Sequence, residues 1–146
     1  MVIPRTCIVG CDRSGVWMEV AIGVGCDRGV SLGTLEAALA SALALVGPVE
    51  VRWLATIDRK GDESAILALA AARRWPLVLY PSRSLACIEV PNPSAQVLRH
   101  LGVPAVAEAA ALLAAGADIG DLLLEKYKYR GQDGKHVTLS VAAWRR

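Results

Sequence analysis

The chain has 146 residues, of which 54% are hydrophobic and 21% are charged. This length predicts a single domain, and the composition supplies a packed core, which excludes global disorder. The formal net charge of +2 is too small to indicate nucleic-acid binding, which requires a dense basic stripe.

The sequence also argues against a metal-binding, secreted or membrane protein. Its four cysteines, at positions 7, 11, 26 and 87, do not pair into any metal-ligand spacing. The first residues lack the pattern of a secretory signal. The longest apolar stretches contain Glu36 or Glu108 and fall short of a membrane span. We therefore expect a cytoplasmic protein.

The first residues contain a short duplication. The pentapeptide Val-Gly-Cys-Asp-Arg occurs at residues 9–13 and again at 24–28. Two copies do not make a repeat architecture, which needs at least three units. Residues 1–17 are either an N-terminal extension or an added edge strand at 6–9. The domain itself is expected over residues 18–146.

The first predicted elements are a strand, a helix and a second strand. The strand at 19–26 ends in a glycine-flanked turn, after which Ser31 is a suitable N-cap. Apolar residues at three- and four-residue steps over 32–46 mark one face of the helix, which Gly47-Pro48 ends. The next strand, at 49–57, is apolar enough to be buried on both faces.

The remaining elements continue the alternation. Asp62 is expected to cap a helix at 63–74, with Leu67 among its inward-facing residues. The elements predicted after it are a strand at 77–80, a helical turn at 82–87, helices at 95–101 and 106–115, and strands at 122–130 and 136–143 joined by an Asp-Gly hairpin. This order predicts a three-layer α/β/α fold with a mixed, mostly parallel sheet and a C-terminal antiparallel hairpin.

The turn after the first strand has the outline of an anion site. Residues Gly25 to Gly29 lead into a helix at Ser31, where free backbone N–H groups carry a partial positive charge. Arg28 adds a cation that suits a carboxylate. The same glycines are equally explained by a tight strand-to-helix turn.

Polar side chains also occur at the end of the second strand, at Thr56, Asp58 and Lys60. Parallel neighbouring strands would place them beside the Gly25 turn, where ligands bind in α/β sheets. Asp58 and Lys60 could form a proton-transfer pair, or Lys60 could bind a carboxylate while Asp58 braces the loop.

Two further segments contribute candidate contacts. Prolines on both sides of Asn92 present its amide in a pre-set loop, and Ser94 either contacts a ligand or caps the next helix. Glu108 begins another helix, where a first-turn carboxylate is favourable in itself.

The C-terminal stretch is basic and can be interpreted in two ways. Its cations are Lys126, Lys128, Arg130, Lys135, Arg145 and Arg146. They form either an anion-binding surface or a solvated edge strand defended by lysines.

Four segments taken in order, residues 23–31, 55–63, 90–94 and 102–110, resemble the CobE family, which is the family of the C-terminal domain of CbiG in cobalamin biosynthesis. The basic hairpin at 126–141, with its Val-Thr-Leu-Ser-Val strand, is similar as well. The family commonly has a basic residue where Asp27 stands, and this departure weakens the expected anion site.

The resemblance implies an α/β domain that acts in the assembly of the corrin ring, either as an enzyme or without catalysis. CobE implies an accessory or handover protein that binds a precorrin or corrin intermediate. CbiG implies a hydrolase that opens a lactone on a cobalt-precorrin and releases acetaldehyde. Any cobalt would travel in the ligand, so no cofactor is expected. Other cobalamin-pathway enzymes are the further expected partners, and nucleic acid and membrane are not.

Corrin precursors are apolar macrocycles fringed with carboxylates, which helix N-termini and basic side chains would bind. The expected substrate-binding residues are Gly25, Arg28, Gly29, Ser31, Thr56, Asn92, Ser94, Glu108, Lys126 and Lys128. The expected catalytic pair is Asp58 and Lys60.

Overall fold

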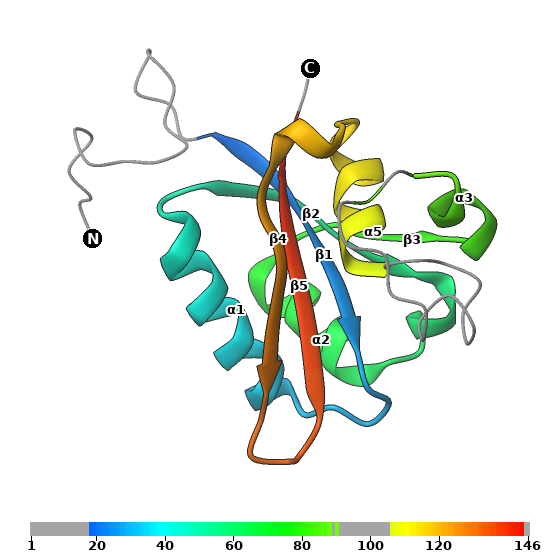
Figure 1. Cartoon of the computed structure of the whole chain (residues 1–146). Coiled ribbons are helices and arrows are strands. Elements are labelled where there is room, and N and C mark those ends of the chain that lie inside the picture. Colours follow the sequence, from blue (N-terminus) through cyan, green and yellow to red (C-terminus); the bar gives the residue numbers. More distant parts are fainter. Residues whose placement is uncertain (1–17, 89, 91–105, 145–146) are drawn as a thin grey trace.

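The computed structural model describes residues 18–88, 90 and 106–144, which form a mixed sheet with helices on both faces (Figure 1). In chain order the elements are β1 (Glu19–Cys26), α1 (Leu32–Val46), β2 (Glu50–Ile57), the 3-10 turn η2 (Asp58–Lys60), α2 (Ser64–Arg73), β3 (Leu77–Tyr80), α3 (Ser82–Ala86), α5 (Val106–Ala115), the 3-10 turn η3 (Ile119–Asp121), β4 (Leu122–Arg130) and β5 (His136–Ala143). The predicted α/β fold is confirmed.

The strand order brings the ends of distant segments to one side of the sheet. The five strands lie in the order β3-β2-β1-β5-β4. The first three strands of the chain are parallel, whereas β5 runs antiparallel to both β1 and β4. The C-terminal ends of β1, β2, β3 and β4 therefore lie together with the first residue of β5. We call this side of the sheet the carboxyl edge.

Helices α1 and α2 cover one face of the sheet. Their buried side chains, among them Leu35, Leu39 and Ile66, pack with Val20, Ile22 and other residues of β1. Burying each such side chain contributes about 1.5–3 kcal/mol. The apolar face predicted for α1 is the one it buries.

Helix α5 covers the opposite face at very short range. A Cβ built on Gly23 of β1 would lie 1.8 Å from the carbonyl oxygen of Ala107, so only glycine allows this approach. A Cβ on Gly25 would lie 3.9 Å from the Ala107 nitrogen. Further along the helix, Ala111 packs with Ala21. The first turn of α5 thus lies at the carboxyl edge, and the helix runs back over β1.

Some details differ from the sequence prediction, and some predictions cannot be compared. The first half of β2 is exposed or partly exposed, whereas the whole strand was expected to be buried on both faces. Helix α2 begins at Ser64 with Glu63 as its N-cap residue, and Asp62 does not cap it. Leu67 is 44% exposed, because the buried row of α2 passes through Ile66 and Leu69. The predicted helix at 95–101 and the residues before 18 lie outside the described residues. Within the described part of the chain, no helix is long and apolar enough to cross a membrane.

Candidate functional site

The turn between β1 and α1 is bound by carboxylates of the chain itself. The Gly29 N–H donates to Glu63 Oε1 over 3.0 Å. The Ser31 N–H donates to Asp133 Oδ2 over 3.0 Å. The Ser31 hydroxyl accepts from the Thr34 N–H and caps α1, as predicted. In this conformation, two N–H groups of the predicted anion site are therefore already occupied.

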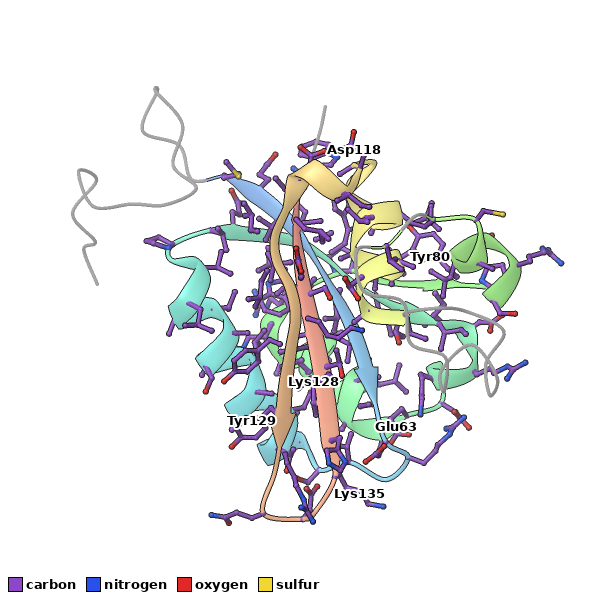
Figure 2. The ribbon with its side chains drawn as sticks, viewed as in Figure 1. Glu63, Tyr80, Asp118, Lys128, Tyr129 and Lys135 are labelled. Atoms are coloured by element: carbon purple, nitrogen blue, oxygen red, sulfur yellow. The ribbon has the colours of Figure 1, made fainter. Side chains whose placement is uncertain are left out.

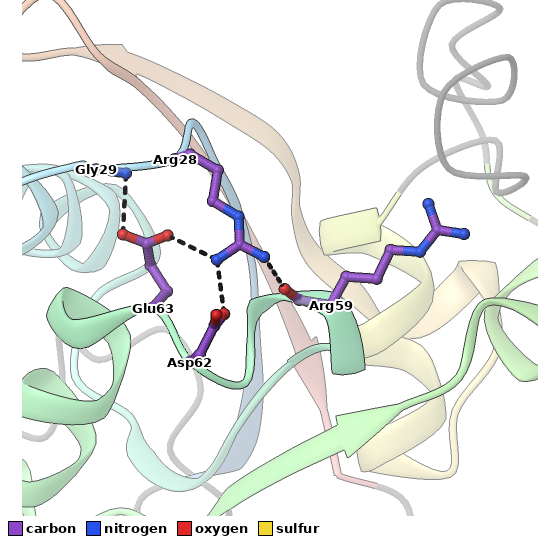
Figure 3. Close-up of polar contacts among 5 residues, drawn as sticks. All are labelled: Arg28, Gly29, Arg59, Asp62 and Glu63. Carbon is purple, nitrogen blue, oxygen red and sulfur yellow. Dashed lines mark hydrogen bonds and ion pairs between the residues drawn. The ribbon is translucent and has the colours of Figure 1, made fainter.

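Arg28 is engaged in the same way (Figure 3). Its guanidinium lies 2.6 Å from Asp62 Oδ1 and 3.5 Å from Glu63 Oε2, and it also donates to the carbonyl oxygen of Arg59. The hydrogen bond from Arg28, together with its charge, lowers the pKa of Asp62. Arg28 thus joins the β1–α1 turn to the segment before α2.

Asp27 and Asp133 fasten the β4–β5 hairpin to this turn. The His136 backbone N–H donates to Asp27 Oδ2 over 2.8 Å, and the His136 ring nitrogen Nδ1 lies 3.0 Å from the same oxygen. Asp133 also accepts from the Lys135 N–H. Backbone N–H groups of Ser31 and Lys135 lower the pKa of Asp133 to about 2. Asp27, where the family commonly has a basic residue, therefore has a structural partner.

Thr56, Asp58 and Lys60, which were predicted at the end of β2, differ in burial and in their contacts. Thr56 is fully buried, and its hydroxyl donates to the carbonyl oxygen of Val24 over 2.7 Å. Asp58 is exposed and Lys60 is partly buried within the turn η2. Among the described residues, no ion pair joins Asp58 to Lys60. Burial raises the pKa of the neighbouring Cys26 thiol to about 11, which makes it a poor nucleophile at neutral pH.

A buried charge pair connects α5 to β4. Glu108, in the first turn of α5, is 0% exposed, and Lys126 Nζ lies 3.5 Å from its Oε1. Apart from this ammonium, neither carboxylate oxygen has a hydrogen-bond partner among the described residues. Burial raises the pKa of Glu108, and the charge of Lys126 opposes that rise. The sequence predicted both residues as site members but gave no sign that they are in contact.

Strand β4 presents cations toward the α5 side of the sheet. Lys126 reaches Glu108, and Lys128 and Arg130 follow at alternate positions, which share one face of a strand. Tyr127 and Tyr129 point the other way and pack against the core under α1. Figure 2 shows Lys128 and Tyr129 on opposite sides of the strand. We call Lys126, Lys128 and Arg130 the β4 cation row.

Other features lie away from this row. A surface cavity of about 450 Å³ is lined by Cys87, Leu112 and Asp118, near the C-terminal end of α5. Asn92 and Ser94 lie outside the described residues. In the described part of the chain, no three His, Cys, Asp or Glu side chains are grouped so that they could hold a metal ion.

The sequence prediction missed the carboxylates that occupy the β1–α1 turn. Glu63 follows Asp62 directly, and Asp133 lies in a hairpin about a hundred residues after the turn. The sequence signals for these contacts were the adjacent acidic residues Asp62 and Glu63, which follow the second strand, and Asp133 in the hairpin. Only the strand order brings all three to the β1–α1 turn, where Asp62 pairs with Arg28 and the other two accept from backbone N–H groups.

Comparison with known proteins identifies relatives in one pathway. A family model described as Cobalamin synthesis G C-terminus matches residues 20–142. A cobalt-precorrin-5A hydrolase of Priestia megaterium is 35% identical over 125 residues, which are 84% of this chain and 32% of that protein. Protein CobE of Sinorhizobium sp is 34% identical over 103 residues, which are 68% of this chain and 67% of that protein. This chain thus spans about a third of the hydrolase.

Solved structures agree with these sequence matches. The crystal structure of CobE, a protein from the cobalamin (vitamin B12) biosynthetic pathway, aligns with a TM-score of 0.70 and 34% identity over 88% of this chain and 94% of that one. The cobalamin biosynthesis protein chiG from Agrobacterium tumefaciens str. C58 aligns with a TM-score of 0.61 and 28% identity over 87% of this chain and 99% of that one. As its motifs predicted, the chain belongs to the family of CobE and the cobalamin synthesis G C-terminus, and its role lies in cobalamin biosynthesis.

Proposed function

We propose that the protein binds a precorrin or corrin intermediate and acts as an accessory or handover protein in cobalamin biosynthesis. The β4 cation row beside the first turn of α5 is the observation that carries this proposal. Residues at alternate strand positions lie about 7 Å apart, so Lys128 and Arg130 would meet separate carboxylates of the ligand. The fringe of acetate and propionate groups on a corrin precursor offers such a series of anions.

The occupied β1–α1 turn favours the β4 cation row over the turn as the anion site. The N–H groups of Gly29 and Ser31 and the guanidinium of Arg28 already hold carboxylates of the chain. A ligand would have to displace these carboxylates, whereas Lys128 and Arg130 have exposed side chains. A Cβ on Gly25 would lie in van der Waals contact with Val106 and Ala107, so the first turn of α5 covers this predicted site residue.

Titration with a corrin of known charge tests this proposal. Cobyrinic acid carries the carboxylate fringe, and its methyl ester has the same ring without those charges. We expect the acid to co-elute with the protein on a desalting column and the ester to elute separately. Replacing both Lys128 and Arg130 by alanine should weaken binding of the acid by about a hundredfold, since each lost charge-assisted contact costs about 1.4 kcal/mol, or tenfold in affinity.

Arg73→Ala is the matched control, because this cation lies at the far end of α2, against Trp75. It should leave the affinity for the acid unchanged. Equal binding of acid and ester, or equal losses for Arg73→Ala and the double variant, would contradict carboxylate recognition by the row. Colourless protein with both ligands would contradict the binding function and leave an adaptor for another pathway enzyme.

A second candidate function is hydrolysis of a precorrin lactone, with release of acetaldehyde. Two observations favour it: the 35% identity to a protein named as cobalt-precorrin-5A hydrolase, and the buried Glu108 beside Lys126. Burial raises the pKa of Glu108, which is the direction that favours a general acid.

Turnover of a cobalt-precorrin lactone, measured as acetaldehyde released, tests the hydrolase. Glu108→Gln should abolish release and retain binding if Glu108 transfers the proton. If Asp58 and Lys60 transfer it, Lys60→Ala should do the same, whereas in a pure binding protein Lys60→Ala could only weaken binding. Wild-type protein that binds the lactone and releases no acetaldehyde would exclude this function.

A further inference from the structure

Within the described structure, Glu108 lacks the several hydrogen bonds that normally accompany a buried carboxylate. The Lys126 ammonium, 3.5 Å from Oε1, is the polar partner that its carboxylate has there. Buried carboxylates are usually hydrogen-bonded as well as paired, because no solvent compensates for missing contacts. The Lys126 side chain, in contrast, is 18% exposed, so it connects the buried carboxylate with the surface.

The other groups facing Glu108 in the described structure do not neutralise it. Strand β4 contributes Glu125 in addition to Lys126, and its negative charge raises the Glu108 pKa further. The strands beneath the first turn of α5 present uncharged residues, including Gly23, Gly25 and Ser140. The Ser140 hydroxyl donates to the Glu125 carbonyl oxygen and so is already used. Lys126 is thus the single cation that faces Glu108 among the described residues.

We propose that Glu108 is an internal substitute for a ligand carboxylate on Lys126, and that it takes up a proton when a carboxylate of the bound tetrapyrrole replaces it. This inference rests on the proposed binding function. One ammonium cannot neutralise two carboxylates in a desolvated site. The ligand carboxylate stays partly in water, whereas Glu108 does not, so Glu108 is the group that becomes protonated. The proton comes from solvent, and only the new O–H bond of Glu108 forms.

This exchange makes binding depend on pH in a defined direction. Because the complex holds one proton more than the free protein and ligand, binding weakens as the pH rises. In the pH range in which each binding event takes up one whole proton, the affinity should fall by up to about tenfold per pH unit. In free protein, Glu108 holds the Lys126 ammonium in place for the incoming carboxylate, which makes Glu108 a positioning residue for the β4 cation row.

Isothermal titration of the whole chain with cobyrinic acid, in PIPES and in Tris, tests the proton uptake. These buffers differ in ionisation heat, so uptake of a proton gives different apparent binding enthalpies. We expect uptake approaching one proton per ligand for the wild type. Glu108→Gln, which preserves the shape of the side chain, should bind with no buffer dependence.

Two lysine variants separate this exchange from charge attraction in general. Lys128→Ala should lower the affinity and keep the buffer dependence. Lys126→Gln should lose both affinity and buffer dependence, which provides a second test if Glu108→Gln does not fold. Binding by the wild type without buffer dependence, or unchanged dependence in Glu108→Gln, would overturn this inference alone. No binding of cobyrinic acid by the wild type would overturn the proposed function and this inference with it.

Discussion

Gly23 of β1 lies directly beneath the carbonyl group of Ala107 in α5, where a Cβ would stand 1.8 Å from the oxygen. This approach sets the height of α5 above the sheet. It also fixes where the first turn of the helix, which carries Glu108, meets the carboxyl edge. The geometry of the candidate site therefore depends on a residue that has no side chain.

Gly23→Ala should destabilise the protein by about 1–3 kcal/mol or more, because α5 must move away from β1 to accept one methyl group. Urea unfolding followed by circular dichroism measures the change. Gly33→Ala is the control: it adds a methyl group in the first turns of α1, with Ser31 Oγ 3.9 Å away, and should be neutral or stabilising. Equal stabilities for the two variants would contradict the close packing of α5.

Thr56 is predicted to act in the fold. Thr56→Val keeps the shape but removes the hydroxyl that donates to Val24, so the free energy of unfolding should fall by about 1–3 kcal/mol. Thr56→Ser keeps the hydroxyl and therefore the hydrogen bond to Val24, so we expect it to be more stable than Thr56→Val. Corrin binding by folded Thr56→Val should match the wild type. A loss of binding with full stability would make Thr56 a ligand contact instead.

Arg28→Ala separates the β1–α1 turn from the β4 cation row. Since Arg28 is bound to Asp62 and lies 3.5 Å from Glu63, its loss should lower the unfolding midpoint in urea. Binding of cobyrinic acid should weaken less than in Lys128→Ala. The reverse order of binding losses, measured at equal concentrations of folded protein, would place the ligand carboxylates at the turn.

Asp133 should make the free energy of unfolding depend on pH in the acid range. Its folded pKa, about 2, lies below the value of an unfolded aspartate near 3.9, so its contribution is complete above about pH 4 and is lost as the pH falls toward 2. Asp133→Asn should flatten this part of the stability profile. Glu50→Gln, at the exposed start of β2, controls for the loss of one negative charge. An unchanged slope in Asp133→Asn would contradict the bonds to Ser31 and Lys135.

Periodicity and turn chemistry predicted most of the fold. The strands at 19–26, 122–130 and 136–143 and the helix at 106–115 have the predicted bounds. Each begins or ends beside a glycine, proline or hairpin signal, and such local signals do not depend on tertiary contacts. The cap of α2 was predicted wrongly because Asp62 instead pairs with Arg28, more than thirty residues earlier.

The candidate site was predictable only as a set of residue types at strand ends. The sequence indicated Arg28, Lys126 and Glu108 but not their partners. The Glu108–Lys126 contact requires α5 to lie close over β1 and β4 to lie beside β5. The first follows from the approach of Ala107 to Gly23, and the second from the strand order. Local patterns carry no information on such long-range packing.

The most direct test of the account is an NMR titration of isotope-labelled protein with diamagnetic dicyanocobyrinic acid. Backbone amide shifts would show where the ligand lies. We expect the largest changes in β4 from Lys126 to Arg130 and in the first turn of α5, with α2 near Arg73 unaffected. Changes confined to the cavity around Cys87 and Asp118, or to the Gly25–Ser31 turn, would contradict the β4 cation row as the binding site.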